Sequence, residues 1–293
     1  MRIIAENLSY VYSEKSKSLA VKALNNISLT IEEGEFFGII GKTGSGKSTF
    51  IQHLNGLIPL QKNKGSLVVG DYNLSDKKPN YKELRANVGM VFQYPEYQLF
   101  AETVFDDVAF GIKNFMPSTS PEETAKMVEN ALSLVGLNYN EIKDKSPFEL
   151  SGGQKRRVAI AGVIVTRPQV LVLDEPVAGL DPQGKRDFLA LLKKLHKEFV
   201  KTIIIVSHDM NLVAEYCTSV AVFNDGSLVK VGKPKEVFAD EEMLKNAGLE
   251  LPTTEELTLA LKKKGIDLNN DLTIDSFINA VVEKFSNKGG SSL

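Results

Sequence analysis

Short runs of apolar residues recur along the first 230 positions of the chain, and stretches with helical periodicity separate them. The runs that predict strands cover residues 36–40, 88–92, 170–173, 202–206 and 220–223. A run without polar positions fits a strand that is covered on both faces, as in a parallel sheet with helices on either side. The intervening segment 183–199 repeats its apolar residues at helical spacing. This alternation predicts an α/β fold.

Two segments depart from the alternation within this region. Residues 28–31 alternate polar and apolar positions before Glu32-Glu33-Gly34, which predicts an antiparallel strand and turn at the edge of the fold. Between about residues 95 and 168 the pattern is helical. There, Ser120 is expected to cap a helix and Gly136 to end it. This stretch is interpreted as a helical lobe inserted into the α/β core.

The strand signals stop after about residue 232. The sequence Thr253-Thr254-Glu255-Glu256 predicts a capping box for a helix that ends at Gly265, and a second helix is expected at 273–285. Residues 286–293 are mostly small and polar and are expected to be disordered. We therefore expect two parts: a domain at 1–235 and a helical C-terminal extension at 236–293.

Composition narrows the class of protein. The 293 residues include 35 Lys+Arg and 37 Asp+Glu, a net charge of −2, which argues against a dedicated nucleic-acid binder. No run approaches the about 18–20 apolar residues of a membrane-spanning helix, and no signal peptide is seen, so a soluble cytoplasmic protein is expected. Cys217, His53 and His196 are expected to be structural, because no Cys/His cluster is present.

A glycine-rich octapeptide lies between the run 36–40 and the helical stretch 48–54. It has the spacing G-x-x-x-x-G-K-[ST] and consists of Gly41, Lys42, Thr43, Gly44, Ser45, Gly46, Lys47 and Ser48. Its backbone N–H groups and the following helix N-terminus suit a phosphate. Lys47 would reach the β- and γ-phosphates and Ser48 would bind Mg²⁺, with Thr49 beside them. The predicted ligand of this loop is a nucleotide phosphate chain with Mg²⁺.

Two carboxylates follow the run 170–173 directly. Asp174 would hold the metal, and Glu175 could polarise the attacking water as a general base. Buried strands often end in an acidic turn, so this pair gains its weight from the phosphate loop that precedes it in the chain.

A second anion-binding turn, Leu-Ser-Gly-Gly-Gln, occupies residues 150–154. One nucleotide does not need two such loops, so this one is expected to close on ATP held by another subunit. With this pentapeptide the sequence resembles the ATP-binding-cassette (ABC) ATPases, whose two cassettes sandwich two ATP molecules head to tail. The resemblance implies a P-loop NTPase core of that type. It also implies that Ser151, Gly152, Gly153 and Gln154 contact the partner's nucleotide.

The other motifs of that family follow in order over residues 3–232. The resemblance implies that Tyr12 stacks on adenine, although Tyr10 is close and either ring could belong to the core. It implies that Gln93 touches Mg²⁺ and the attacking water and reports to a membrane partner. Asp181 matches the D-loop that crosses to the other cassette, and His208 matches the switch histidine that contacts the γ-phosphate.

The segments 93–100 and 103–111 narrow the resemblance to the ATPases of energy-coupling factor (ECF) importers of vitamins and metal ions, and most closely to the second of their two ATPase subunits. Val177 stands where the family usually has Thr or Ser after Asp-Glu-Pro, and little loss of function is expected from this difference. The resemblance implies a second, related ATPase, an integral-membrane scaffold and a substrate-binding membrane subunit as partners. It places the chain peripherally at the cytoplasmic face of the membrane, with its C-terminal extension stabilising the ATPase pair.

Three alternatives remain beside this reading. The chain could serve a conventional ABC transporter, or an ABC ATPase of DNA maintenance or translation, which carries long coiled coils, zinc modules or two cassettes per chain. It could also bind ATP without hydrolysing it. Glu175 and His208 argue against that last alternative.

Overall fold

The computed structural model describes residues 1–12 and 20–286, and its centre is a six-stranded sheet with the order β10-β9-β3-β8-β7-β6. The pairs from β9 to β6 are parallel, and β10 is antiparallel to β9. The strands are β3 (Phe36–Ile40), β6 (Val88–Val91), β7 (Val170–Asp174), β8 (Thr202–Val206), β9 (Ser219–Asn224) and β10 (Ser227–Gly232). The α/β prediction and all five strand predictions are confirmed.

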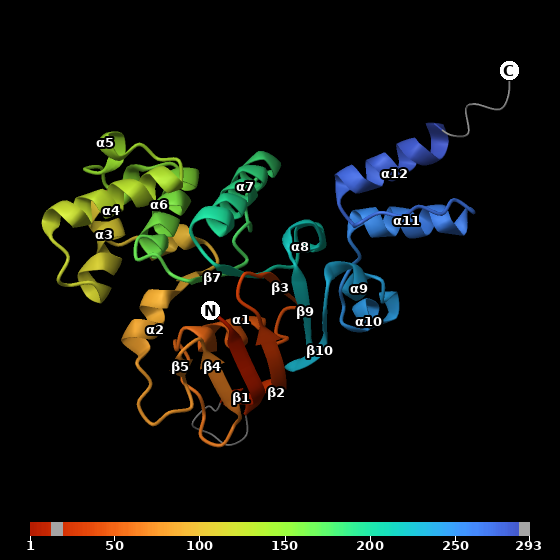
Figure 1. The fold of residues 1–293 in the computed structure, drawn as a ribbon, viewed down its shortest axis with the longest axis horizontal. Coiled ribbons are helices and arrows are strands. Elements are labelled where there is room, and N and C mark those ends of the chain that lie inside the picture. The colour runs from red at the N-terminus through yellow and green to blue at the C-terminus, as the bar shows by residue number, and fades with distance from the viewer. Residues whose placement is uncertain (13–19, 287–293) are drawn as a thin grey trace.

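The unbroken apolar runs of these strands supply two separate hydrophobic cores. In β3, Phe36 and Ile40 join the core on one face, whereas Phe37 and Ile39 join the core on the other. Successive side chains of a strand point to opposite faces, so a strand that serves two cores needs apolar residues at every position. Figure 1 shows helices on one side of this sheet and a second sheet on the other.

The second sheet is antiparallel, with the order β2-β1-β4-β5. Its strands are β1 (Ile3–Tyr12), β2 (Val21–Ile31), β4 (Ser66–Val69) and β5 (Tyr72–Asn73). The strand predicted at 28–31 is the end of β2. Helix α1 (Lys47–Leu54) buries Phe50 and Ile51 in the core that the two sheets share. The N-terminus of α1 is thereby held at the end of β3.

The predicted helical lobe is present between β6 and β7. It contains η1 (Pro95–Gln98), α3 (Val104–Phe115), α4 (Pro121–Leu134), α5 (Tyr139–Ile142), η2 (Pro147–Glu149) and α6 (Gly152–Ile164). The Ser120 side chain accepts a hydrogen bond from the N–H of Glu123, and Gly136 has φ +75°, so both predicted ends of α4 are confirmed. Three further helices lie outside this lobe in the chain: α2 (Tyr81–Asn87) before β6, and α7 (Pro182–Glu198) and α8 (Met210–Tyr216) after β7 (Figure 1).

The C-terminal extension consists of α9 (Pro234–Phe238), α10 (Glu241–Asn246), α11 (Thr253–Lys263) and α12 (Ile274–Ser286). The predicted capping box at Thr253 is wrong: Pro252 takes the cap position, and the Thr253 N–H donates instead to Asn211 Oδ1 of α8 at 2.8 Å. Val237, Phe238 and Leu244 join the main core, whereas α12 buries no residue. Apart from Ser286, which ends α12, the predicted disordered tail lies outside the described residues.

Among residues 1–12 and 20–286, no helix has the length and apolar character needed to cross a membrane.

Candidate ATP site

The phosphate loop connects β3 to α1 along a path that admits no side chain at its two ends. A Cβ on Gly41 would lie 2.3 Å from the carbonyl oxygen of Phe223, and a Cβ on Gly46 would lie 2.4 Å from that of Ala23. Gly46 also has φ +101°, a conformation that L-residues rarely adopt. The backbone itself therefore forms the surface of this loop, as a phosphate cradle requires.

Lys47 places its ammonium group inside the loop. Its Nζ donates to the carbonyl oxygens of Gly41 at 2.5 Å and Lys42 at 2.9 Å. Burial lowers the pKa of Lys47, while the nearby carboxylates of Glu175 and Asp174 oppose that shift. The loop therefore holds a desolvated cation at the N-terminus of a helix, which favours a bound anion.

Asp174 ends β7 and lies opposite Val206 of β8. Burial raises the pKa of its carboxyl group, and the Ser48 side chain and the Lys47 ammonium counteract this. The structure thus brings the predicted metal ligands Ser48 and Asp174 together beside the phosphate loop. A hydroxyl and a carboxylate are hard oxygen donors, and they fit Mg²⁺, which commonly uses one or two carboxylates plus phosphate oxygens.

Glu175 and His208 lie in direct contact. Glu175 Oε1 is 2.8 Å from His208 Nδ1, and the His208 N–H donates to Oε2 at 3.4 Å. The carboxylate side chain is 15% exposed and the imidazole 73%. Glu175 has φ +46°, and its N–H donates to the carbonyl oxygen of Val206. Backbone strain of this kind concentrates at functional sites, and the contact with His208 brings the two predicted residues together.

Tyr12 is better placed than Tyr10 to meet an adenine ring. Its side chain is 42% exposed at the end of β1, and its hydroxyl lies 3.3 Å from Thr49 Oγ1 on α1. Tyr10 packs edge-on against Tyr12 on one side and His53 on the other. Gln93 is exposed two residues after the end of β6. The structure therefore favours Tyr12 where the sequence left both tyrosines open.

The turn at residues 150–154, called the signature turn from here on, has no hydrogen bond to the phosphate loop of its own chain in the described structure. Ser151 and Gln154 form a capping box at the start of α6, and a Cβ on Gly152 or Gly153 would meet nothing within 4 Å. Asp181 is exposed and caps α7 through the N–H of Gly184. Among the described residues, no hydrogen bond or ion pair joins the signature turn or Asp181 to residues 41–49.

The three residues expected to be structural are buried or contact backbone carbonyl groups. His53 is buried, and its Nδ1 contacts the carbonyl oxygen of Thr49 at 2.7 Å. His196 Nε2 lies 3.1 Å from the carbonyl oxygen of Gly34. Cys217 is buried, and burial raises the pKa of its thiol far above the usual range.

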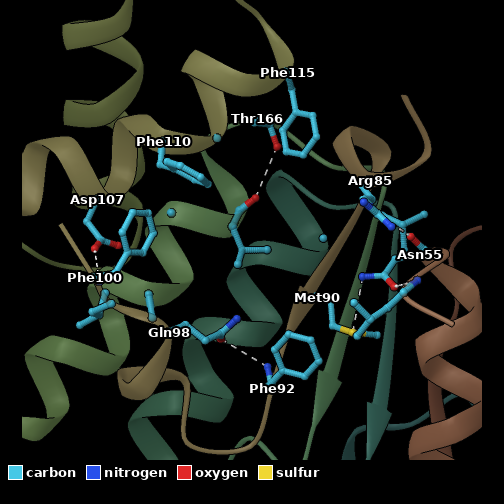
Figure 2. Close-up of a pocket in the computed structure, with 18 residues that line it drawn as sticks. Asn55, Arg85, Met90, Phe92, Gln98, Phe100, Asp107, Phe110, Phe115 and Thr166 are labelled. Carbon is cyan, nitrogen blue, oxygen red and sulfur yellow. Dashed lines mark hydrogen bonds between the residues drawn. The ribbon is translucent and has the colours of Figure 1, made fainter. Parts of the chain in front are cut away.

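A cavity of about 380 Å³ lies beside the segment that follows Gln93. Figure 2 shows Phe100 and Phe110 on one side of it and Arg85 on the other. The two phenyl rings meet edge to face, with centroids 4.8 Å apart, yet both side chains are about half exposed. Asp107 accepts hydrogen bonds from the N–H groups of Phe100 and Ala101, which fixes this wall. Sequence patterns did not reveal this cavity, because its walls come from elements far apart in the chain.

Comparison with known proteins supplies relatives over nearly the full length. A sequence profile of the ABC transporter family matches residues 24–178. The energy-coupling factor transporter ATP-binding protein EcfA2 of Clostridium perfringens is 49% identical, over 98% of this chain and 99% of its own length. The EcfA2 protein of Clostridioides difficile is 47% identical, over 99% of each chain.

Solved structures agree with these relatives. CbiO1 of Clostridium perfringens, described as part of the ABC transporter complex CbiONQ, has a TM-score of 0.70 and 40% identity, covering 87% of this chain and 97% of its own. The dimeric ATP-binding cassette MJ0796, in a post-hydrolysis state with ADP and Pi, has a TM-score of 0.69 and 30% identity. It covers 79% of this chain and 98% of its own.

Proposed function

Because this chain belongs to the ABC transporter family, as an ATP-binding and ATP-hydrolysing subunit of the energy-coupling factor type, we propose that it supplies half of each of two composite ATP sites. The other halves come from a second, related ATPase. The pair works at the cytoplasmic face of a membrane and energises an importer of a vitamin or a metal ion.

The separation of the two half-sites carries this proposal. Lys47, Asp174, Glu175 and His208 gather around one phosphate loop, whereas residues 151–153 of the signature turn are exposed and, in the described part of the chain, the Ser151 side chain bonds only to Gln154 at the start of α6. A helix N-terminus with open backbone N–H groups suits an anion, and α6 presents one to solvent. The nucleotide that it meets is therefore held by another subunit.

The chemistry follows from the side chains of one site. The loop N–H groups and Lys47 bind the β- and γ-phosphates, and Tyr12 stacks on the base. Ser48, Asp174 and Gln93 would hold Mg²⁺, which would neutralise charge on the transferred phosphoryl group. Glu175 accepts a proton from the attacking water.

The switch histidine and the partner's loop complete the site. His208, in contact with Glu175, orients that carboxylate and donates to the γ-phosphate. From the other subunit, the equivalents of Ser151, Gly152, Gly153 and Gln154 close on the phosphates and Asp181 crosses the interface. Binding therefore joins the two cassettes, and loss of the γ-phosphate releases them.

An oligomerisation experiment tests this function directly. The purified chain is mixed with its related ATPase, with and without Mg-ATP, and the mass is measured by light scattering. We expect a two-ATPase complex that forms with Mg-ATP and hydrolyses it. A chain that stays monomeric at saturating Mg-ATP, with or without its relative, would contradict the proposal.

The membrane scaffold is proposed to dock in the cavity beside Gln93. The cavity offers phenyl rings on one wall and the Arg85 side chain on the other, which suits the end of an amphipathic helix. The variant Phe110→Asp should reduce co-purification with the membrane subunits while ATP binding persists. Phe148→Asp is the matched control, because Phe148 is also exposed, at 59%, but does not line the cavity. Equal loss in both variants would argue against this docking site.

The C-terminal helix α12 is proposed to stabilise the ATPase pair. Ile274, Ile278, Val282 and Phe285 recur at helical spacing and are each 47–60% exposed. Such an apolar stripe needs a partner surface. Ile278→Asp should weaken pairing of the two ATPases in light scattering without changing nucleotide binding, whereas Asn279→Asp on the neighbouring polar face should not. Unchanged pairing in Ile278→Asp would remove this role.

A further inference from the structure

Arg156 is a buried cation in the signature helix α6. The residue is 5% exposed and is followed by the buried Val158 and Ile160. A buried guanidinium is costly unless its donors are satisfied, because its five N–H groups lose water. The partners of Arg156 therefore indicate what this residue holds in place.

Those partners lie on two other segments. Nε donates to Glu96 Oε2 at 3.3 Å, and Nη2 donates to Glu96 Oε1 at 3.4 Å. On the other edge, Nη1 donates to the carbonyl oxygen of Pro176 at 3.1 Å, and Nη2 to that of Ala178 at 3.2 Å. Glu96 belongs to η1, just after Gln93. One side chain thus joins the segment after Gln93, the signature helix and the turn after Glu175.

The turn after Glu175 packs Val177 and Leu180 against the main core, but it has few other hydrogen-bond anchors in the described structure. Its internal hydrogen bonds run from the Ala178 N–H to the carbonyl oxygen of Glu175 and from the Leu180 N–H to that of Val177. Glu175 itself sits at φ +46°, which persists only where surrounding contacts enforce it. The two carbonyls that Arg156 binds lie one and three residues beyond Glu175.

We propose that Arg156 is a positioning residue for Glu175. Its guanidinium fixes the turn that holds the carboxylate against His208, and its pairing with Glu96 makes that turn sensitive to the position of η1. A displacement of η1 therefore reaches the hydrolytic carboxylate through one side chain. This inference rests on the proposed role of Glu175 as general base.

The test uses the full chain in the assembled transporter, with steady-state phosphate release measured against ATP concentration. Arg156→Gln should lower kcat by about tenfold or more while KM for ATP stays within about twofold, because the phosphate loop is untouched. Arg156→Lys should lose less kcat than Arg156→Gln, since lysine keeps the positive charge but lacks the planar guanidinium that donates along two edges. Glu96→Gln should lower kcat less, because the bonds to Pro176 and Ala178 remain.

A double variant and a matched control separate positioning from general loss of structure. Glu96→Gln with Arg156→Gln should be no slower than Arg156→Gln alone, as expected for residues that act as a unit. The control Arg157→Gln removes the neighbouring arginine of α6, whose Nη1 donates to the Val135 carbonyl within the lobe. Its kcat should stay within about twofold of the parent.

The outcomes distinguish this inference from the function on which it rests. An unchanged kcat in Arg156→Gln, a loss confined to KM, or an equal kcat loss in Arg157→Gln would each overturn the positioning role. If instead the unmodified complex fails to hydrolyse ATP, or Glu175→Gln turns over normally, the proposed function fails first.

Discussion

Replacing Glu175 with glutamine removes the proposed base with minimal change of shape. The amide keeps the size of the side chain, and its oxygen can still accept a hydrogen bond from the His208 ring. It cannot accept a proton from water. The backbone strain at φ +46° is the same for both residues, because neither is glycine. The variant therefore isolates the chemistry of the carboxylate from the geometry of the turn.

The expected magnitude follows from what the carboxylate does. General base catalysis contributes about 10²–10⁴-fold, so kcat should fall by that factor, equivalent to about 3–5 kcal/mol of transition-state stabilisation. The free energy of unfolding should fall by less than about 1 kcal/mol, since the amide oxygen can keep the bond to the His208 ring and only the long bond from the His208 N–H, at 3.4 Å, is lost. Affinity for Mg-ATP should be retained, because Lys47 and the loop backbone are intact.

Phosphate release by the assembled complex measures kcat, and binding of a fluorescent ATP analogue measures affinity. Glu149→Gln is the matched control, an exposed glutamate of η2 outside the phosphate loop. We expect the site that Glu175→Gln alters, the one at this chain's own phosphate loop, to keep Mg-ATP bound without turnover. A kcat within about threefold of the parent would refute the base assignment, because a lost general base must cost far more.

Three further predictions concern the phosphate loop and the helix behind it. Lys47→Ala should weaken Mg-ATP binding at least about tenfold in a titration, since a charge-assisted contact to phosphate is lost. Gly46→Ala should lower the free energy of unfolding in urea by about 1–3 kcal/mol more than Gly44→Ala, because both have positive φ but a Cβ clashes only at Gly46. Burial lowers the pKa of His53 from 6.5, so the unfolded chain binds a proton that the folded chain does not, and stability should fall as pH drops below about 6.5. This acid-sensitive slope should be absent in His53→Gln and unchanged in His196→Gln, both measured by urea unfolding across pH.

The central sheet was predictable because its strands are buried on both faces, which leaves an unbroken apolar run as a local signal. The antiparallel sheet was predicted only at the end of β2. Strand β1 is irregular: its register with β2 shifts between Ala5, Leu8 and Tyr10, and Asn7 has φ +50°. These bulges break the period-two pattern that would have marked the strand.

Some parts of the candidate site can likewise be predicted from contiguous sequence, whereas others become visible only in the tertiary structure. The phosphate loop and the acidic pair each consist of consecutive residues, so the sequence predicts them. The partners of Arg156 lie 60 positions before it and about 20 after it, and only the fold joins them. The failed capping box at Thr253 has the same origin, because Asn211 from another helix satisfies the N–H that a local side chain was expected to cap.

The positions of two helix N-termini constrain how the subunits assemble. The start of α1 serves the phosphate loop and the start of α6 serves the signature turn, and each offers backbone N–H groups and a positive dipole end to an anion. In the described structure residues 151–153 are exposed and no hydrogen bond joins the signature turn to residues 41–49, so under the proposed function the two helix starts of one chain serve two different ATP molecules. Two chains related by a two-fold or pseudo-two-fold axis can place one start of each kind at both sites at once, and that arrangement closes without leaving a free half-site. ATP binding and pairing are therefore thermodynamically linked: the nucleotide that strengthens the pair must itself bind more tightly to the pair than to either chain alone.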